Sequence, residues 1–132
     1  MNETIILRIV TPSSFVTNDE VLSITMTSEE GEFTVLPGHA MLMANLKIGI
    51  VSFATPSGIL KYFTYGGIAR VTAEAVNIAS EFVVDMQNVE KSEITSKIST
   101  LTAKLAEEIK DSRKDEINNL MSKYEMLMQY IS

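Results

Sequence analysis

Histidine is the side-chain type that gains and loses a proton near neutral pH, and the sequence contains one, His39. A catalytic histidine needs a nucleophile or an orienting carboxylate within hydrogen-bond reach. Ser13, Ser14 and Ser57 are available, but none lies in the G-x-S-x-G pattern that exposes a nucleophile at a strand–helix turn. We therefore interpret His39, which follows Pro37-Gly38, as a residue that holds a loop or fills an interface. A small hydrolase that uses His39 is a distant alternative.

Glu29, Glu30 and Glu32 form an acidic cluster around a glycine. Their spacing does not match the Asp-x-Asp-x-Asp-Gly pattern of a calcium loop, so we expect a solvated turn or, second, a surface for a basic partner. Gly66-Gly67 lacks the Gly-x-x-x-x-Gly-Lys-Ser/Thr pattern of a phosphate-binding loop. The residues alone indicate a binding module without catalysis.

Composition excludes several classes of site. There are no cysteines, so disulfides, thiolate nucleophiles and thiolate metal sites are absent, and one histidine cannot form a multi-histidine metal site. Lys+Arg 11 against Asp+Glu 17 gives a net charge of −6, the wrong sign for nucleic acid. We expect no cofactor, no metal and no nucleic-acid partner.

The length of 132 residues suits one domain, or a small domain with an appendage. The N-terminal residues 1–4 carry no cationic region and no long apolar segment follows them, which argues against a signal peptide. No apolar run approaches the roughly 20 residues that cross a bilayer. We expect no direct membrane insertion, and any membrane association to come through a partner.

Residues 1–88 read as short strands separated by turns, and contain all six glycines and all three prolines. Apolar, β-branched segments end at Thr11–Ser14, Asn18–Glu20, Glu29–Gly31 and Thr55–Gly58, which are rich in turn-forming residues. Turn signals every eight to twelve residues, with no helical pattern between them, predict an all-β sandwich or flattened barrel.

Residues 89–132 switch to helical periodicity and contain no helix breaker. Two apolar stripes, each along one face of a helix, predict an antiparallel α-helical hairpin. Ser112-x-x-Asp115 resembles a capping box that could start the second helix. The residues expected to pack the hairpin are Ile94, Ile98, Leu101, Leu105, Ile109, Ile117, Leu120, Met121, Tyr124 and Met128.

A single long helix is the alternative for this region. The polar segment Lys110–Glu116 between the stripes contains neither Gly nor Pro, so a helix could run through it if a partner covered the stripes. If the hairpin and the single helix were close in free energy, the segment could switch between them.

The segment Glu30–Ala40, with the sequence EGEFTVLPGHA, resembles the signature of the epsilon subunit family of the rotary F-type ATP synthase. The resemblance continues at the family's spacing through Leu46-x-x-Gly49, Tyr65–Val71 and Val76–Ala79, and covers nearly the whole chain. The two-part layout is also that of the family.

The resemblance implies a non-catalytic rotor subunit of the central stalk, which couples c-ring rotation through gamma to ATP synthesis. It implies gamma and the c-ring as partners, and possible contact of the C-terminal helices with alpha and beta in regulating ATP hydrolysis. It assigns the c-ring-facing loop to Glu29, Glu30, Gly31 and Glu32, and the gamma-facing segment to Pro37, Gly38, His39 and Ala40. The expected location is peripheral, at the cytoplasmic face of a bacterial inner membrane. A stand-alone β-sandwich binding module with a regulatory hairpin is the second reading.

One stretch departs from the family. Some bacterial members bind ATP through an Ile/Leu-Asp-x-x-Arg-Ala motif, and the matching stretch here, Val89–Ile94, carries Glu93 in place of the arginine. The guanidinium of the motif arginine pairs with phosphate, whereas the carboxylate of a glutamate repels it. We therefore predict no ATP binding of that kind. Few basic residues lie on the second helix, which leaves inhibition of ATP hydrolysis open.

Overall fold

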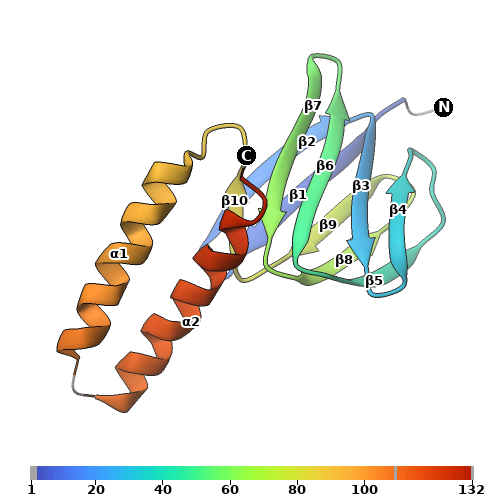
Figure 1. Cartoon of the computed structure of the whole chain (residues 1–132). Coiled ribbons are helices and arrows are strands. Elements are labelled where there is room, and N and C mark those ends of the chain that lie inside the picture. Colours follow the sequence, from blue (N-terminus) through green and yellow to red (C-terminus); the bar gives the residue numbers. More distant parts are fainter. Residues whose placement is uncertain (1–2, 109, 132) are drawn as a thin grey trace. The chain divides into compact units, whose positions relative to one another are not determined.

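The computed structural model describes residues 3–108 and 110–131, which form ten strands and two helices (Figure 1). The chain divides into two compact units, Met1–Gln87 and Asn88–Ser132, one residue before the expected boundary. The strands are β1 (Ile5–Thr11), β2 (Ser14–Val21), β3 (Ser23–Ser28), β4 (Gly31–Val35), β5 (Leu42–Leu46), β6 (Gly49–Thr55), β7 (Gly58–Thr64), β8 (Gly67–Val71), β9 (Ala75–Ala79) and β10 (Val83–Asp85). The helices are α1 (Lys91–Glu107) and α2 (Asp111–Met128).

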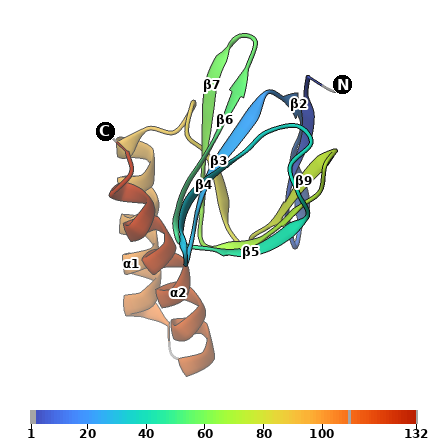
Figure 2. The same cartoon turned by 90° about the vertical axis from the view of Figure 1, so that its right-hand side faces the viewer.

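The strands form one sheet that folds back on itself into a sandwich (Figure 2). Hydrogen-bonded neighbours follow the order β10-β7-β6-β3-β5-β8-β9-β1-β2, and β4 pairs with β3 beside this path. All pairings are antiparallel except that of β1 with β9. The layers β4-β3-β6-β7-β10 and β5-β8-β9-β1-β2 are joined at Ser28 opposite Leu46, which confirms the predicted sandwich.

The core lies between the two layers and follows from alternation along the strands. In β1, Ile5, Leu7 and Ile9 are buried while Ile6 and Arg8 are half-buried, as expected when successive side chains point to opposite faces. The same alternation buries Ile24 and Met26 on β3, Val51 and Phe53 on β6, and Val76 and Ile78 on β9. Burial of this contiguous apolar cluster is the main term that stabilises the sandwich.

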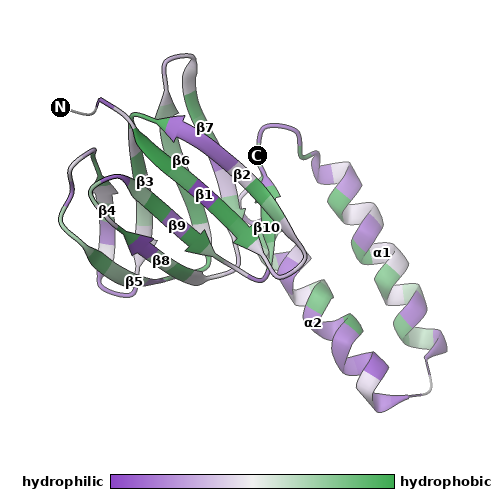
Figure 3. Ribbon diagram, turned by 180° about the vertical axis from the view of Figure 1, so that it is seen from behind, coloured by the Kyte–Doolittle hydropathy of each residue, from purple (hydrophilic) through white to green (hydrophobic). Residues whose placement is uncertain are grey.

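The predicted turn at Asn18–Glu20 is wrong. These three residues continue β2, where Asn18 pairs with Arg8 and Asp19 with Leu7. β2 ends the strand order and is largely hydrophilic (Figure 3), which an edge strand tolerates because one face and one edge meet water. Pairing with β1 therefore overrides the turn preference of Asn and Asp. The short strand β10, which pairs with the end of β7, was not predicted.

The helical hairpin is confirmed, with a break between the helices instead of one continuous helix. Glu108 and Lys110 adopt extended backbone angles, and the Glu108 carboxylate accepts the backbone N–H of Lys110 at 3.1 Å. The predicted capping box is wrong, because α2 already begins at Asp111 and Ser112 lies inside it. Asp111 in the first turn favours this start through the helix dipole.

Candidate partner-binding cleft

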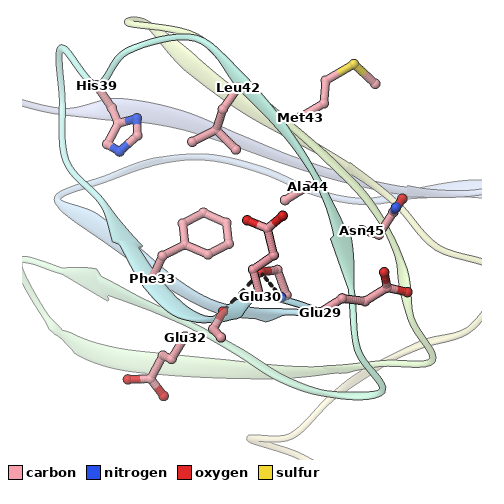
Figure 4. A pocket seen from close by; sticks show the side chains of 11 residues that line it. Glu29, Glu30, Glu32, Phe33, His39, Leu42, Met43, Ala44 and Asn45 are labelled. Atoms are coloured by element: carbon pink, nitrogen blue, oxygen red, sulfur yellow. Dashed lines mark hydrogen bonds between the residues drawn. The ribbon is translucent and has the colours of Figure 1, made fainter.

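The predicted acidic loop is a tight turn between β3 and β4. Buried Ser28 anchors it: its hydroxyl donates to the Gly31 carbonyl at 3.1 Å and accepts the backbone N–H of Glu30 at 3.2 Å (Figure 4). Gly31 has a φ of 123°, a conformation that glycine adopts without strain. The turn leaves Glu29, Glu30 and Glu32 exposed.

The second predicted segment, Pro37–Ala40, begins with a turn that its sequence dictates. Proline fixes the second position and Gly38, with a φ of 83°, takes the third, as a type II turn requires. The backbone N–H of His39 closes this turn on the Leu36 carbonyl at 3.1 Å, and the N–H of Gly38 donates to the Ala73 carbonyl at 2.9 Å. The bond from Gly38 ties the loop to the middle of the β8–β9 connection.

His39 uses its ring within this loop. Its Nδ1 lies 2.7 Å from the carbonyl oxygen of Ala40, so the N–H at that atom donates to the neighbouring backbone. This contact fits the expected loop-holding role. In the part of the chain that the structure describes, no group of three or more His, Asp or Glu side chains is placed so that it could hold a metal ion.

A cleft of about 460 Å³ brings the two predicted segments together. In Figure 4, Glu30 reaches into the cleft from the turn, Phe33 from β4 and Leu42 from β5. Glu32 and Met43 point away from it. Its lining is made of Ser28, Glu29, Glu30, Gly31, Glu32, Phe33, His39, Leu42, Met43, Ala44 and Asn45. Of the segment Pro37–Ala40, which was predicted to face gamma, only His39 lines the cleft, while Pro37, Gly38 and Ala40 form the loop beside it.

The cleft has an apolar floor and an acidic margin. Phe33 and Leu42 are partly buried and pack against the core, so the floor continues the interior of the sandwich. Three glutamates and no lysine or arginine line it. Large apolar side chains beside it are exposed, with Met41 at 80%, Met43 at 65% and Leu36 at 57%. An acidic border around exposed apolar groups is suited to a partner surface that is apolar and basic.

At the opposite margin of the sandwich, side chains of β7 and β2 lie close together. Tyr62 of β7 lies beside Thr17 of β2, whose hydroxyl donates to the carboxylate of Asp19. Burial raises the pKa of the Tyr62 phenol above its ordinary 10.0, the charge of Asp85 raises it further, the hydrogen bond with Thr17 lowers it, and Asp19 adds a smaller increase. This group was missed at the sequence level, because its members lie 45 residues apart (62 − 17) with no shared pattern.

The residues predicted to pack the hairpin lie on α1 and α2, except Ile109, which is outside the described residues. Ile94 and Leu101 are buried. The other seven predicted hairpin residues that the structure describes are half-buried: Ile98, Leu105, Ile117, Leu120, Met121, Tyr124 and Met128. A shallow groove between the helices is lined by Leu101, Leu120 and Tyr124 together with Ser96, Lys97 and Thr100. The Lys97 ammonium lies 5.6 Å from the centre of the Tyr124 ring, a cation–π contact between the helices.

None of the described helices has the length and apolar character of a membrane span.

Comparison with known proteins gives a consistent set of matches. Residues 4–86 match the family model described as "ATP synthase, Delta/Epsilon chain, beta-sandwich domain". Two relatives named "ATP synthase epsilon chain" come from Rickettsia felis, at 37% identity, and Rickettsia rickettsii, at 35%. Each alignment covers 82% of this chain and 99% of the relative.

Two solved assemblies contain chains of similar fold. One is the Euglena gracilis mitochondrial ATP synthase (OSCP/F1/c-ring), with a TM-score of 0.67, 22% identity, and coverage of 98% of this chain and 82% of that one. The other is the Tetrahymena thermophila mitochondrial ATP synthase (central stalk/c-ring), with a TM-score of 0.54, 17% identity, and coverage of 64% and 68%. At these identities the likeness concerns the fold.

Proposed function

The chain belongs to the ATP synthase delta/epsilon family, and from this we propose that it is the non-catalytic epsilon-type subunit of the central stalk. Its role is to couple rotation of the c-ring, through gamma, to ATP synthesis. The observation that carries the proposal is the family match over the whole sandwich together with relatives aligned over nearly their full length.

We propose the cleft and its two segments as the partner surface of this subunit. Glu29–Glu32 form the c-ring-facing loop and Pro37–Ala40 the gamma-facing segment. Support comes from their position: the acidic turn and His39 line one cleft, beside exposed Met41 and Met43. A subunit that moves with the rotor needs rigid contacts, and both segments are held by backbone hydrogen bonds.

The α1–α2 unit is proposed as the regulatory part, with alpha and beta as its possible partners. Its compactness as a separate unit supports this assignment. A truncation after Asn88 in the assembled enzyme tests it. A rise in ATP hydrolysis is expected if the helices inhibit, and an unchanged rate removes inhibition from the proposal. On the same proposal the subunit is peripheral and lies at the cytoplasmic face of a bacterial inner membrane.

The decisive experiment is to tag this chain in its own cells, isolate it gently and identify what is recovered with it. We expect alpha, beta and gamma subunits together with the c-ring. Recovery of another stoichiometric partner, with none of the synthase subunits, would instead favour the stand-alone binding module.

A further inference from the structure

The two strands that border the cleft leave backbone edges without a strand neighbour. β4 pairs with β3 along Gly31–Val35 and with no other strand of the described part of the chain. β5 pairs with β8 along Leu42–Leu46, but meets β3 only where Leu46 lies opposite Ser28. Beyond that point the layers diverge, and the cleft of about 460 Å³ opens between β4 and β5.

Free strand edges are normally protected by lysine, proline or a bulge, because they pair readily with other chains. β4 has none of these features, and its only charged residue is Glu32, near its start. β5 carries no charge and no proline. At the opposite margin of the sandwich, by contrast, the side chains of Tyr62 on β7 and Thr17 on β2 approach each other.

We propose that the cleft binds an extended, basic segment of a partner protein, which pairs through its backbone with the free edge of β4. Addition of a strand to a sheet edge is a general mode of peptide recognition, in which backbone hydrogen bonds give affinity and side chains give specificity. The apolar floor of Phe33 and Leu42 accepts alternate apolar side chains. The carboxylates of Glu29 and Glu30 select lysine or arginine.

The inference deepens the proposed function. It depends on that function for one point, which is that the bound segment belongs to another subunit of the stalk. Five residues of β4 span about 17 Å at the usual rise of a strand, which is enough for a short segment. The edge and the charges are properties of this chain, whatever the partner.

Amide hydrogen exchange at residue resolution tests the backbone pairing, with the chain compared free and within the complex isolated from cells. Pairing is expected to slow alternate amides of Glu32–Val35 by about tenfold or more, because only every second N–H faces the free edge. Unchanged exchange, or slowing without alternation, would overturn the proposal. So would slowing of the free chain that grows with its concentration, which would identify a second copy as the occupant.

Charge reversal tests the basic character of the segment. Glu30→Lys is expected to weaken recovery of the complex about tenfold, with the loss reduced at high salt because screening weakens both attraction and repulsion. Glu20→Lys, at an exposed position of β2 away from the cleft, is the matched control. Equal recovery of the two variants contradicts the inference while leaving the stalk role intact. Absence of synthase subunits with the unaltered chain contradicts the stalk role itself.

Discussion

The phenol of Tyr62 on β7 lies beside the hydroxyl of Thr17 on β2, although the two strands lie near opposite ends of the strand order. Within the described residues no backbone ladder joins these strands, so the contact between them is made by side chains. The carboxylates of Asp85, which lies opposite Tyr62 in the pairing of β10 with β7, and of Asp19 also act on the phenol.

This contact predicts a loss of stability in alkaline solution. The folded-state pKa of Tyr62 lies above the unfolded value of 10.0, so the folded protein retains a proton that the unfolded chain releases. The free energy of unfolding therefore falls as pH rises through 10 and continues to fall until the folded-state pKa is passed. Denaturant unfolding between pH 8 and pH 12, followed by strand circular dichroism, measures this fall.

Tyr62→Phe should flatten that pH dependence, because the substituted side chain no longer titrates. At neutral pH it should lower the free energy of unfolding by about 1 kcal/mol or less, because the removed hydroxyl makes at most one ordinary hydrogen bond. Tyr65→Phe removes a phenol from the same unit and serves as the control. A Tyr62→Phe curve parallel to that of the unaltered protein above pH 10 would remove Tyr62 as the cause.

Gly67→Ala should destabilise the sandwich by about 2–4 kcal/mol. Gly67 has a φ of 127°, and an added Cβ would collide with the carbonyl oxygen of Ala79 on the neighbouring strand. Gly58→Ala separates the two causes, because Gly58 has a φ of 137° but open space around it. It should cost only about 1 kcal/mol of backbone strain. Equal losses in thermal unfolding would show that the collision is relieved by movement of the strand.

Leu101→Ala should loosen the helical hairpin by about 2–3 kcal/mol, since Leu101 is buried and its removal leaves a cavity. Leu105→Ala, at a half-buried position one turn later, should cost less. Amide exchange of α1 and α2 reports the loss, and the core strands should keep their protection because the chain divides into two compact units. Faster exchange in β1 and β9 would contradict that independence.

Millimolar ATP should leave the amide NMR signals of Val89–Ile94 in place. Glu93 lies in the first turn of α1, and its Oε1 is 3.9 Å from the Lys97 ammonium. A phosphate that approached this turn would therefore meet a carboxylate, which repels it. Saturable shifts would contradict the prediction. Shifts in Glu93→Arg that the unaltered chain lacks would assign the absence of binding to this one charge.

Most of the fold could be predicted because periodicity reports which face of a strand or helix is buried. Ile5, Leu7 and Ile9 alternate in the sequence and alternate in burial. β2 failed this test, because an edge strand with Asn18 and Asp19 carries turn-forming residues and takes its conformation from pairing with β1. Likewise, the start of α2 depends on the Glu108 carboxylate and on Asp111, which a motif centred on Ser112 does not include.

The candidate site could be predicted in its parts and not in its geometry. The acidic turn and the Pro37-Gly38 turn are local, since each follows from residues adjacent in the sequence. The cleft arises because β4 and β5 separate after meeting β3, and no pattern within either strand encodes that separation. For the same reason Asn45 and Met43 were not predicted as lining residues.

The parallel pairing of β1 with β9 determines when β1 gains its second neighbour during synthesis. Ile6 pairs with Ala75 and Val10 with Ala79, so β1 acquires this neighbour only after the eight strands β2 to β9 have been synthesised. Until then β1 has only β2 beside it, and its apolar face stays uncovered. A nascent chain in which β9 has not yet emerged from the ribosome should therefore be open to protease at β1, while one in which β9 has emerged should protect β1 before the helical hairpin has emerged.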